Sequence, residues 1–281
     1  MKKKKGIVTN IILILVLVIG LSLLLYPTFS DWWNSRVQSR AVANYSQLVS
    51  VMNQEDYTKT WEEAKAYNQS LLGRRNEYLL SEEQQAQYQA LFNLDGHGIM
   101  GYIEIPSLSQ TMPLYHGTEE DVLQVAIGHL EWTSLPTGGA GNHSVFSGHR
   151  GLPSAKLFTD LDKLLVGDVF MLHILDETLT YEVDQIRIVE PDVTEDLLPQ
   201  EGKDLCTLFT CTPYGVNSHR LLVRGHRVDN VEQAQTVRVT ADAMIVDQLV
   251  VVPFVLLPIL LVMLVMLLLT TRKKKNRRNE K

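Results

Sequence analysis

The sequence Thr207-Leu-Phe-Thr-Cys-Thr-Pro-Tyr-Gly215 is followed at once by a run that ends His219-Arg-Leu-Leu-Val-Arg-Gly225. These runs predict two β-strands joined by a turn, with Cys211 at the end of the first strand and Arg220 at the start of the second. A thiol would then lie beside a fixed cation. His149, in the run Ser147-Gly-His-Arg-Gly-Leu-Pro-Ser154, adds a proton donor. The chain therefore holds the three groups that acyl transfer through a thiol requires.

The region around these residues has the pattern of a small β-domain. Short β-rich runs occupy 99–105, 112–115, 143–147, 168–175, 179–189, 206–211 and 221–228. Two short helices are expected between them, at 119–127 and 155–164. Seven or eight strands separated by turn residues indicate a closed barrel or a sandwich.

The segment that precedes the β-rich region is predicted to be helical. No proline occurs between Pro27 and Pro106, and apolar residues recur at helical spacing from residue 31 to about 93. Residues 53–57 are expected to break this neck into two helices. The polar run that begins at Ser81 is typical of a helix start.

Two apolar stretches near the ends of the chain predict membrane helices. Residues 6–26 follow the basic cluster Lys2 to Lys5 and suit an uncleaved signal anchor, with a cleaved signal peptide as the alternative. Residues 249–270 carry no charge and precede a basic tail, and their two prolines kink such a helix without forbidding it. The positive-inside rule places both termini in the cytoplasm and residues 28–248 outside.

Composition sorts the chain into segments and limits its partners. The predicted order is a basic cluster and signal anchor (1–27), a helical neck with a lid-equivalent region (28–95), a catalytic β-domain (96–229), a tether (230–248), a membrane helix (249–270) and a basic tail (271–281). The two tails hold 11 of the 26 Lys and Arg residues but only one of the 32 acidic residues. The region between them is thus strongly acidic, which makes nucleic acid an improbable partner.

The two cysteines, Cys206 and Cys211, are predicted to have different roles. Five residues apart on one strand, they point to opposite faces, so a disulfide between them is not expected. A free thiol kept in an exported domain suggests reactivity. We interpret Cys206 as a small core residue and Cys211 as the reactive one.

Arg220 and His149 are the groups expected to activate Cys211, because a free thiol is largely protonated near neutral pH. The guanidinium of Arg220 can hold a thiolate, a carbonyl or an oxyanion, although a surface ion pair is its ordinary use. His149 can act as general acid and base, or be a simple loop residue.

Zinc binding by the histidines at 129, 143 and 149 is an alternative that no recognised ligand spacing supports. The remaining histidines are interpreted as surface or strand-flanking residues; they are at 97, 116, 173, 219 and 226.

Several motifs together closely resemble the sortases, and the pilus-assembling class C sortases in particular. They are the stretch 207–225, the stretch 147–162 that begins Ser-Gly-His-Arg-Gly, the runs Asn93-Leu-Asp-Gly96 and Gly101-Tyr-Ile-Glu-Ile-Pro106, and Tyr115-His-Gly-Thr118. The resemblance covers roughly residues 65–229. Two membrane spans around the β-domain also look like class C.

This resemblance implies a mainly β fold, an eight-stranded sortase barrel preceded by a helical segment and flanked by two transmembrane helices. It implies a cysteine transpeptidase on the surface of a Gram-positive cell, with Cys211 as nucleophile, His149 as general acid and base, and Arg220 as stabiliser of substrate and oxyanion. The implied partners are pilin subunits with a Leu-Pro-x-Thr-Gly-type sorting signal and an acceptor lysine. No cofactor and no metal take part.

One departure from class C concerns the lid that commonly covers the active site. The Asp-Pro-aromatic motif of that lid is absent here, since no proline precedes the barrel after Pro27. Lid autoinhibition is therefore not carried over. Trp132 stands where a glycine is expected, and it either shapes the binding groove or packs on the surface.

Two other functions fit the same residues. One is a sortase that anchors monomeric proteins to peptidoglycan. The other is a non-enzymatic assembly scaffold whose barrel binds extended peptides along a strand edge.

Overall fold

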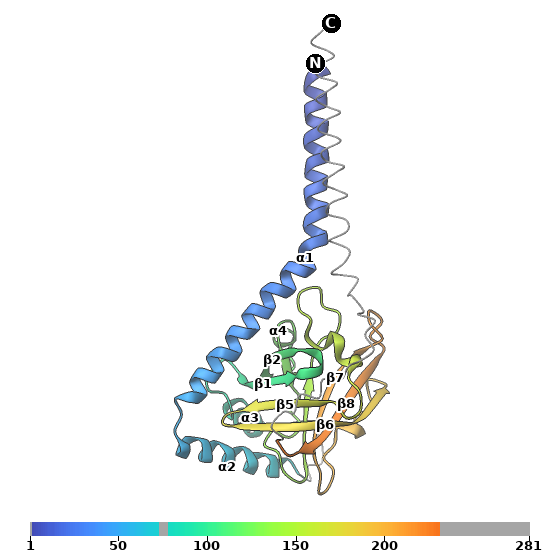
Figure 1. The fold of residues 1–281 in the computed structure, drawn as a ribbon. Helices are drawn as coiled ribbons and strands as arrows, with labels where there is room; N and C mark the ends of the chain where they lie inside the picture. Colours follow the sequence, from blue (N-terminus) through green and yellow to red (C-terminus); the bar gives the residue numbers. More distant parts are fainter. Residues whose placement is uncertain (1, 73–77, 231–281) are drawn as a thin grey trace. The chain divides into compact units, whose positions relative to one another are not determined.

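Eight strands form a closed barrel in the computed structural model, which describes residues 2–72 and 78–230, with side chains from residue 12 onward (Figure 1). The strands are β1 (Ile99–Ile105), β2 (Gln110–His116), β3 (Ile127–His129), β4 (Asn142–Ser147), β5 (Val169–Ile174), β6 (Glu177–Val189), β7 (Asp204–Thr212) and β8 (His219–Val228). Around the barrel they follow the order β1-β2-β3-β4-β7-β8-β6-β5. The predicted barrel is confirmed, and the sandwich alternative is wrong.

Strand β3 was not predicted, because the segment 119–127 was expected to be helical throughout. Only α4 (Glu120–Leu123) is helical there, and β3 begins at Ile127. This three-residue strand runs parallel to β2 and antiparallel to β4, and it closes the gap between them. It is too short to show an alternating pattern, so its pairing is decided by the neighbouring strands.

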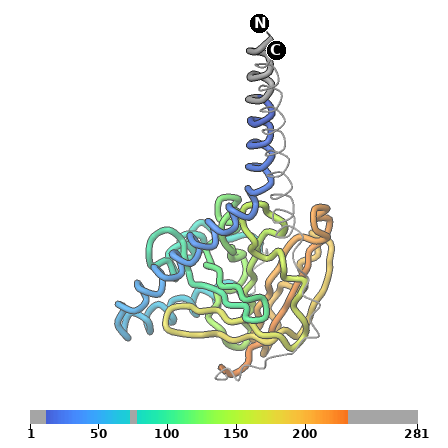
Figure 2. Tube along the Cα trace, turned by 45° about the horizontal axis from the view of Figure 1, so that its top comes forward, coloured from blue at the N-terminus to red at the C-terminus, as the bar shows by residue number. Residues whose placement is uncertain are grey.

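The neck is helical as predicted, although the break between its first two helices lies at residues 51–53 rather than at 53–57. Helix α1 (Lys2–Ser50) ends just before Asn53, whose side chain accepts a hydrogen bond from Asp56 N (2.9 Å) and caps α2 (Gln54–Leu71). Ser81 and Gln84 form a reciprocal capping box at the start of α3 (Glu82–Ala90). Figure 2 shows the sharp turn of the chain between α1 and α2. Three short 3₁₀ helices complete the fold: η1 (Pro106–Leu108), η2 (Leu157–Lys163) and η3 (Glu195–Leu197).

Helix α1 continues through Pro27 rather than ending there. By length and composition its part from Ile12 onward could cross a membrane, and it is the one such helix among the described residues. The predicted second span, 249–270, lies outside the described residues. Contacts divide the described chain into a helical unit up to Trp32 and a compact unit from Trp33 onward.

The compact unit contains the barrel, and Tyr45 of α1 is part of its core. The Tyr45 side chain is only 1% exposed. Its hydroxyl donates to Met100 O (3.0 Å) on β1 and accepts from Leu175 N (2.8 Å), just after β5. One side chain thereby satisfies two buried backbone groups on adjacent strands, which ties α1 to the barrel.

Replacement of this hydroxyl tests the attachment. We expect Tyr45→Phe to lower the free energy of unfolding by roughly 1–3 kcal/mol, because it leaves a buried carbonyl and a buried amide without partners. Denaturant titration of the full chain in detergent measures the change. Tyr26→Phe, at a position of the same helix that is 55% exposed, is the matched control and should alter stability little. Equal stability of the two variants would contradict the proposed role of Tyr45.

Candidate functional site

Cys211 and Arg220 face each other directly on neighbouring strands. Cys211 is the last residue but one of β7, Arg220 is the second residue of β8, and the two are partners in the antiparallel register. Residues 213–218 join the two strands, and the backbone pairing of the strands fixes their register. Side chains of directly opposed residues lie on the same face of the sheet.

His149 follows the strand on the other side of Cys211. Strand β4 runs parallel to β7, and its last residue, Ser147, pairs with Phe209. The contact continues past the end of β4, since Gly148 N donates to Phe209 O (3.2 Å) and Thr210 Oγ1 donates to Gly148 O (2.7 Å). Continuing the same register by two residues brings His149 level with Cys211. Three neighbouring segments thus bring the three predicted residues to one place.

The site lies on the outer face of the barrel. Along β7, Cys206 and Leu208 belong to the main core, and the alternation of side chains directs Cys211 to the opposite face with Phe209. On that face a second apolar cluster forms under the loop between β6 and β7. Its members are Val145, Val189, Leu197 and Leu222, with Leu130, Trp132, Val193 and Phe209 packed against them. The three predicted residues therefore lie at one end of this second apolar cluster.

The two thiols differ in access. Cys211 is partly exposed, whereas Cys206 has no exposed surface and both are free. Burial raises the pKa of Cys206 well above its usual value, so that this sulfur stays protonated. The prediction that Cys206 is a core residue is confirmed. Only Cys211 is within reach of a substrate.

One nitrogen of the Arg220 guanidinium is bound to the backbone, and the other donors remain available. Nη1 donates to Asn217 O (3.3 Å), in the turn that precedes β8, and to His219 O (3.1 Å), at the first residue of β8. Within the described part of the chain, no carboxylate lies at ion-pair distance from this guanidinium. The surface ion pair that is the ordinary use of an arginine is not seen, and the other donors of Arg220 can serve a ligand.

A second arginine stabilises the loop that carries His149. Arg150 donates to Thr212 Oγ1 (3.2 Å) at the end of β7 and forms an ion pair with Asp162. Its side chain is only 11% exposed. The role of this residue could not be predicted from the sequence, because its partners Thr212 and Asp162 are distant from it along the chain.

Gly151 provides a further link between the two loops of the site. The ring of Tyr214, in the turn after Cys211, lies against this glycine, and a β-carbon at position 151 would be 2.7 Å from Tyr214 Cε2. The glycine also has a φ of +80°, which other residues rarely adopt. Close packing of Tyr214 on Gly151 fixes the spacing between the His149 loop and the Cys211 turn.

The histidines considered as zinc ligands have other partners in the structure. His129 is fully buried between Tyr88 OH (3.1 Å) and Ser134 O (2.9 Å). His143 is fully buried between Leu198 O (3.0 Å) and Thr207 Oγ1 (2.8 Å). Each set of partners suits a neutral imidazole with one donor and one acceptor. These two side chains stabilise the fold rather than join His149.

His116 corrects the interpretation of the remaining histidines as surface residues. It is 4% exposed, and its two ring nitrogens lie 2.9 Å from Gly98 O and 2.8 Å from Leu91 O. It connects the end of β2 to the segment that follows α3. A histidine beside a glycine turn does not reveal in the sequence that the preceding helix will cover it.

Trp132 lies partly buried against the second apolar cluster. The ring of Tyr78 meets it edge to face, with centroids 4.9 Å apart, and Tyr78 OH lies 2.7 Å from Thr194 Oγ1. The region before α3 thus reaches both loops that border the outer face. Of the two interpretations of Trp132, the structure favours the one in which it shapes this face.

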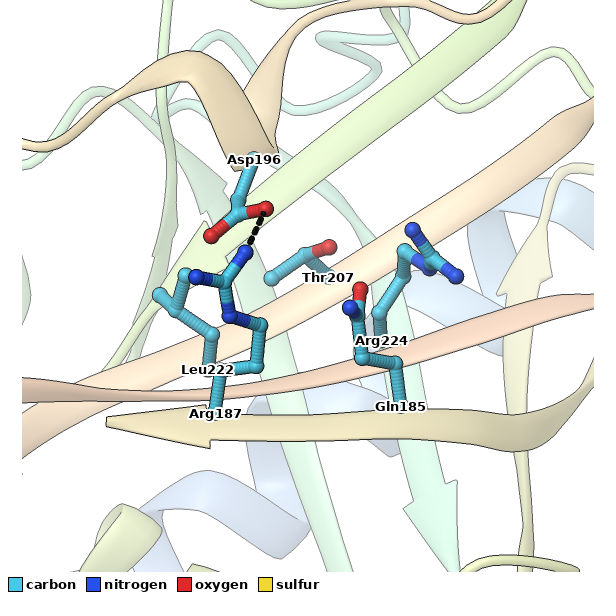
Figure 3. A pocket seen from close by; sticks show the side chains of 6 residues that line it. All are labelled: Gln185, Arg187, Asp196, Thr207, Leu222 and Arg224. Atoms are coloured by element: carbon cyan, nitrogen blue, oxygen red, sulfur yellow. Dashed lines mark hydrogen bonds and ion pairs between the residues drawn. The ribbon is translucent and has the colours of Figure 1, made fainter. Parts of the chain in front are cut away.

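A small surface pocket lies farther along the same face (Figure 3). It is lined by Gln185, Arg187, Asp196, Thr207, Leu222 and Arg224. Arg187 Nη1 is paired with Asp196 Oδ1 (2.6 Å), and Arg224 forms two hydrogen bonds with Asp184 (2.9 and 3.0 Å). Thr207 is four residues from Cys211, or about 13 Å along a strand. The pocket is therefore separate from the predicted catalytic residues.

Comparison with known proteins agrees with this fold. Residues 103–228 match the sortase domain model. The chain is 30% identical to sortase D of Bacillus subtilis (strain 168) over 147 residues, which cover 51% of this chain and 71% of that protein. The chain belongs to the sortase family. It is thus a cysteine transpeptidase, and the non-enzymatic scaffold considered above is set aside.

Further relatives include sortases of more than one type. Sortase A of Bacillus anthracis is 29% identical over 220 residues, covering 78% of this chain and 94% of that protein. Among solved structures, sortase C1 of Streptococcus agalactiae is 53% identical with a TM-score of 0.66, covering 68% of this chain and all of that one. Sortase C of Streptococcus pneumoniae is 43% identical with a TM-score of 0.60, covering 68% and 97%. These two structural neighbours of this sortase are class C enzymes.

The buried histidines predict how the stability of this sortase depends on pH. Burial lowers the pKa of His129 to about 3 and that of His143 to about 4. The unfolded chain, with ordinary values near 6.5, binds more protons below that pH, so stability falls on acidification. Between pH 7 and pH 5 we expect a loss of about 2 kcal/mol for each of the two. Denaturant titrations at several pH values measure it.

Substitution separates these histidines from the others. His143→Asn should lower stability at pH 7 but make the dependence on pH less steep, because one depressed pKa is removed. His226→Asn, at an exposed position of β8, should leave the dependence unchanged. Equal slopes for the wild type and His143→Asn would show that His143 is not buried as a neutral group.

Proposed function

We propose that Cys211, His149 and Arg220 carry the transpeptidase reaction of this sortase. Cys211 attacks the carbonyl carbon of the scissile peptide bond, and a thioester replaces that bond. His149 protonates the departing amine and later accepts a proton from the incoming one. Arg220 donates hydrogen bonds to the substrate carbonyl and to the oxyanion that forms on attack. The observation that carries the proposal is the direct pairing of Cys211 with Arg220, with the His149 segment on the next strand.

The donor substrate is an extended sorting signal of the Leu-Pro-x-Thr-Gly type, cleaved between threonine and glycine. The apolar outer face supports this assignment, since Phe209 is partly exposed two residues before Cys211 on the same face and could receive an apolar residue that precedes the scissile bond. The resemblance described above supplies the identity of the signal.

The acceptor is a lysine amine of another pilin, so that repeated reactions polymerise a surface pilus. Support comes from the class C structural neighbours, one of which, the sortase C of Streptococcus pneumoniae, is described in connection with pilin substrate specificity. The N-terminal helix and the basic clusters at both ends of the chain suit a membrane enzyme whose barrel lies outside the cell.

Removal of the thiol tests the chemistry. We expect Cys211→Ala to abolish the thioester adduct with a sorting peptide and to lower transfer at least about 10³-fold, because no other group can form the acyl enzyme. Mass spectrometry of the trapped enzyme detects the adduct. Cys206→Ala is the matched control and should keep the adduct, since Cys206 is buried in the core. An adduct that survives Cys211→Ala would overturn the assignment.

Competition between acceptors tests the pilin role. With the wild-type acyl enzyme we expect a peptide that carries the pilin lysine to be consumed in preference to a peptidoglycan stem amine. Chromatography of the two products, formed from equal concentrations of acceptor, gives the ratio. Exclusive use of the stem amine would instead support the anchoring of monomeric proteins.

A further inference from the structure

Glu120 lies beside His149. Its Oε2 is 3.9 Å from His149 Nε2, and its side chain is 75% exposed. Glu120 is the first residue of α4, which leads into β3. In the barrel order β3-β4-β7-β8, the strand that follows α4 and the strand of Arg220 lie on opposite sides of β4 and β7, from which His149 and Cys211 come. Glu120 and Arg220 thus belong to segments on opposite sides of those that carry the imidazole and the thiol.

The carboxylate of Glu120 is oriented toward the imidazole. Gln124 Nε2 donates a hydrogen bond to Oε1, which leaves Oε2 to face His149. The carboxylates of the two neighbouring acids, Asp121 and Glu119, have other contacts. Asp121 Oδ1 accepts from Val122 N (3.0 Å), and the carboxylate of Glu119 folds over Gly117. Glu120 is thus the one of the three that faces the catalytic histidine.

Helix α4 is fixed in place by close backbone packing. Gly117 N donates to Tyr88 OH (2.9 Å), and Leu123 N donates to Glu119 O (3.0 Å). At Gly128 of β3 a β-carbon would be 2.2 Å from Gly117 O, so only glycine allows this approach. The position of Glu120 relative to the end of β4, which His149 follows, therefore depends on the barrel itself.

Glu120 Oε2 and His149 Nε2 are close enough to share one donor group. Within the described chain His149 Nε2 has no hydrogen-bond partner, and because this atom is buried, the exposed side chain of Glu120 has to turn aside as a donor enters. A separation of 3.9 Å is too long for a direct hydrogen bond, yet a nitrogen beside the line between the two atoms could lie about 2.8 Å from each. An ammonium group can donate to both at once. We propose that Glu120 binds the ammonium of the acceptor amine and presents it to His149.

This inference rests on the proposed function, in which an amine resolves the acyl enzyme. An alkyl amine such as lysine is protonated near neutral pH and must lose two protons to become an amide. His149 Nε2 takes the first proton, and the free amine then attacks the thioester carbonyl. A C–N bond forms, the C–S bond breaks, and the second proton goes to the departing sulfur.

Steady-state partition between acceptors tests the subsite. Full-length enzyme in detergent receives a saturating sorting peptide and either a lysine peptide or hydroxylamine, which is uncharged at neutral pH. We expect Glu120→Gln to lower the ratio of aminolysis to hydrolysis for the lysine peptide roughly three- to tenfold. The ratio for hydroxylamine and the single-turnover rate of thioester formation should not change, because neither involves an ammonium.

Asp121→Asn is the matched control, since it removes the same charge one residue away and should leave all three quantities unchanged. An unaltered ratio for the lysine peptide in Glu120→Gln would overturn the inference. An equal fall with hydroxylamine, or slower thioester formation, would overturn it too, because Glu120 would then act through His149 or the fold. A wild-type enzyme that forms no thioester would instead refute the proposed function.

Discussion

The site depends on the pairing of β7 with two different neighbours. On one side β7 is parallel to β4, and on the other it is antiparallel to β8. The parallel register fixes where the chain leaves β4 toward His149, and the antiparallel register fixes Arg220 opposite Cys211. A shift of one residue in either pairing would turn a side chain to the other face of the barrel. The geometry of the reactive groups is therefore as rigid as the barrel.

The same strands build the core and the site because their side chains alternate. Along β7, Cys206 and Leu208 fill the interior while Thr207, Phe209 and Cys211 face outward. The loop between β6 and β7 covers part of that outer face through Leu197, and the cover ends before Cys211. A thiol in the interior is held protonated by burial, whereas one five residues later is open to substrate. One strand thereby carries an inert and an accessible cysteine.

The sequence was sufficient for much of this arrangement. Alternation and turn residues predicted seven strands, and the polar run that begins at Ser81 predicted the start of α3. Strand β3 could not be predicted, because three residues are too few to show an alternating pattern. The strand exists through its pairing with β2 and β4. Arg150 and Glu120 could not be predicted for another reason, because each has a partner distant in the chain. Arg150 contacts Thr212 of β7, and Glu120 lies beside His149. The pattern of apolar residues in a segment indicates which face of that segment is buried. It does not indicate which side chains of other strands will contact that face.

The charges of Arg220 and Glu120 bear on the competition between amine and water. Water is abundant at an exposed thioester, so an amine prevails only if it is held next to the carbonyl. In the proposed reaction Arg220 receives the carbonyl oxygen, while Glu120 attracts the ammonium. Water carries no charge, so the carboxylate attracts it less strongly than it attracts an ammonium. Because Gly117 and Gly128 bring α4 close to β3, this preference for amines follows from the packing of the barrel.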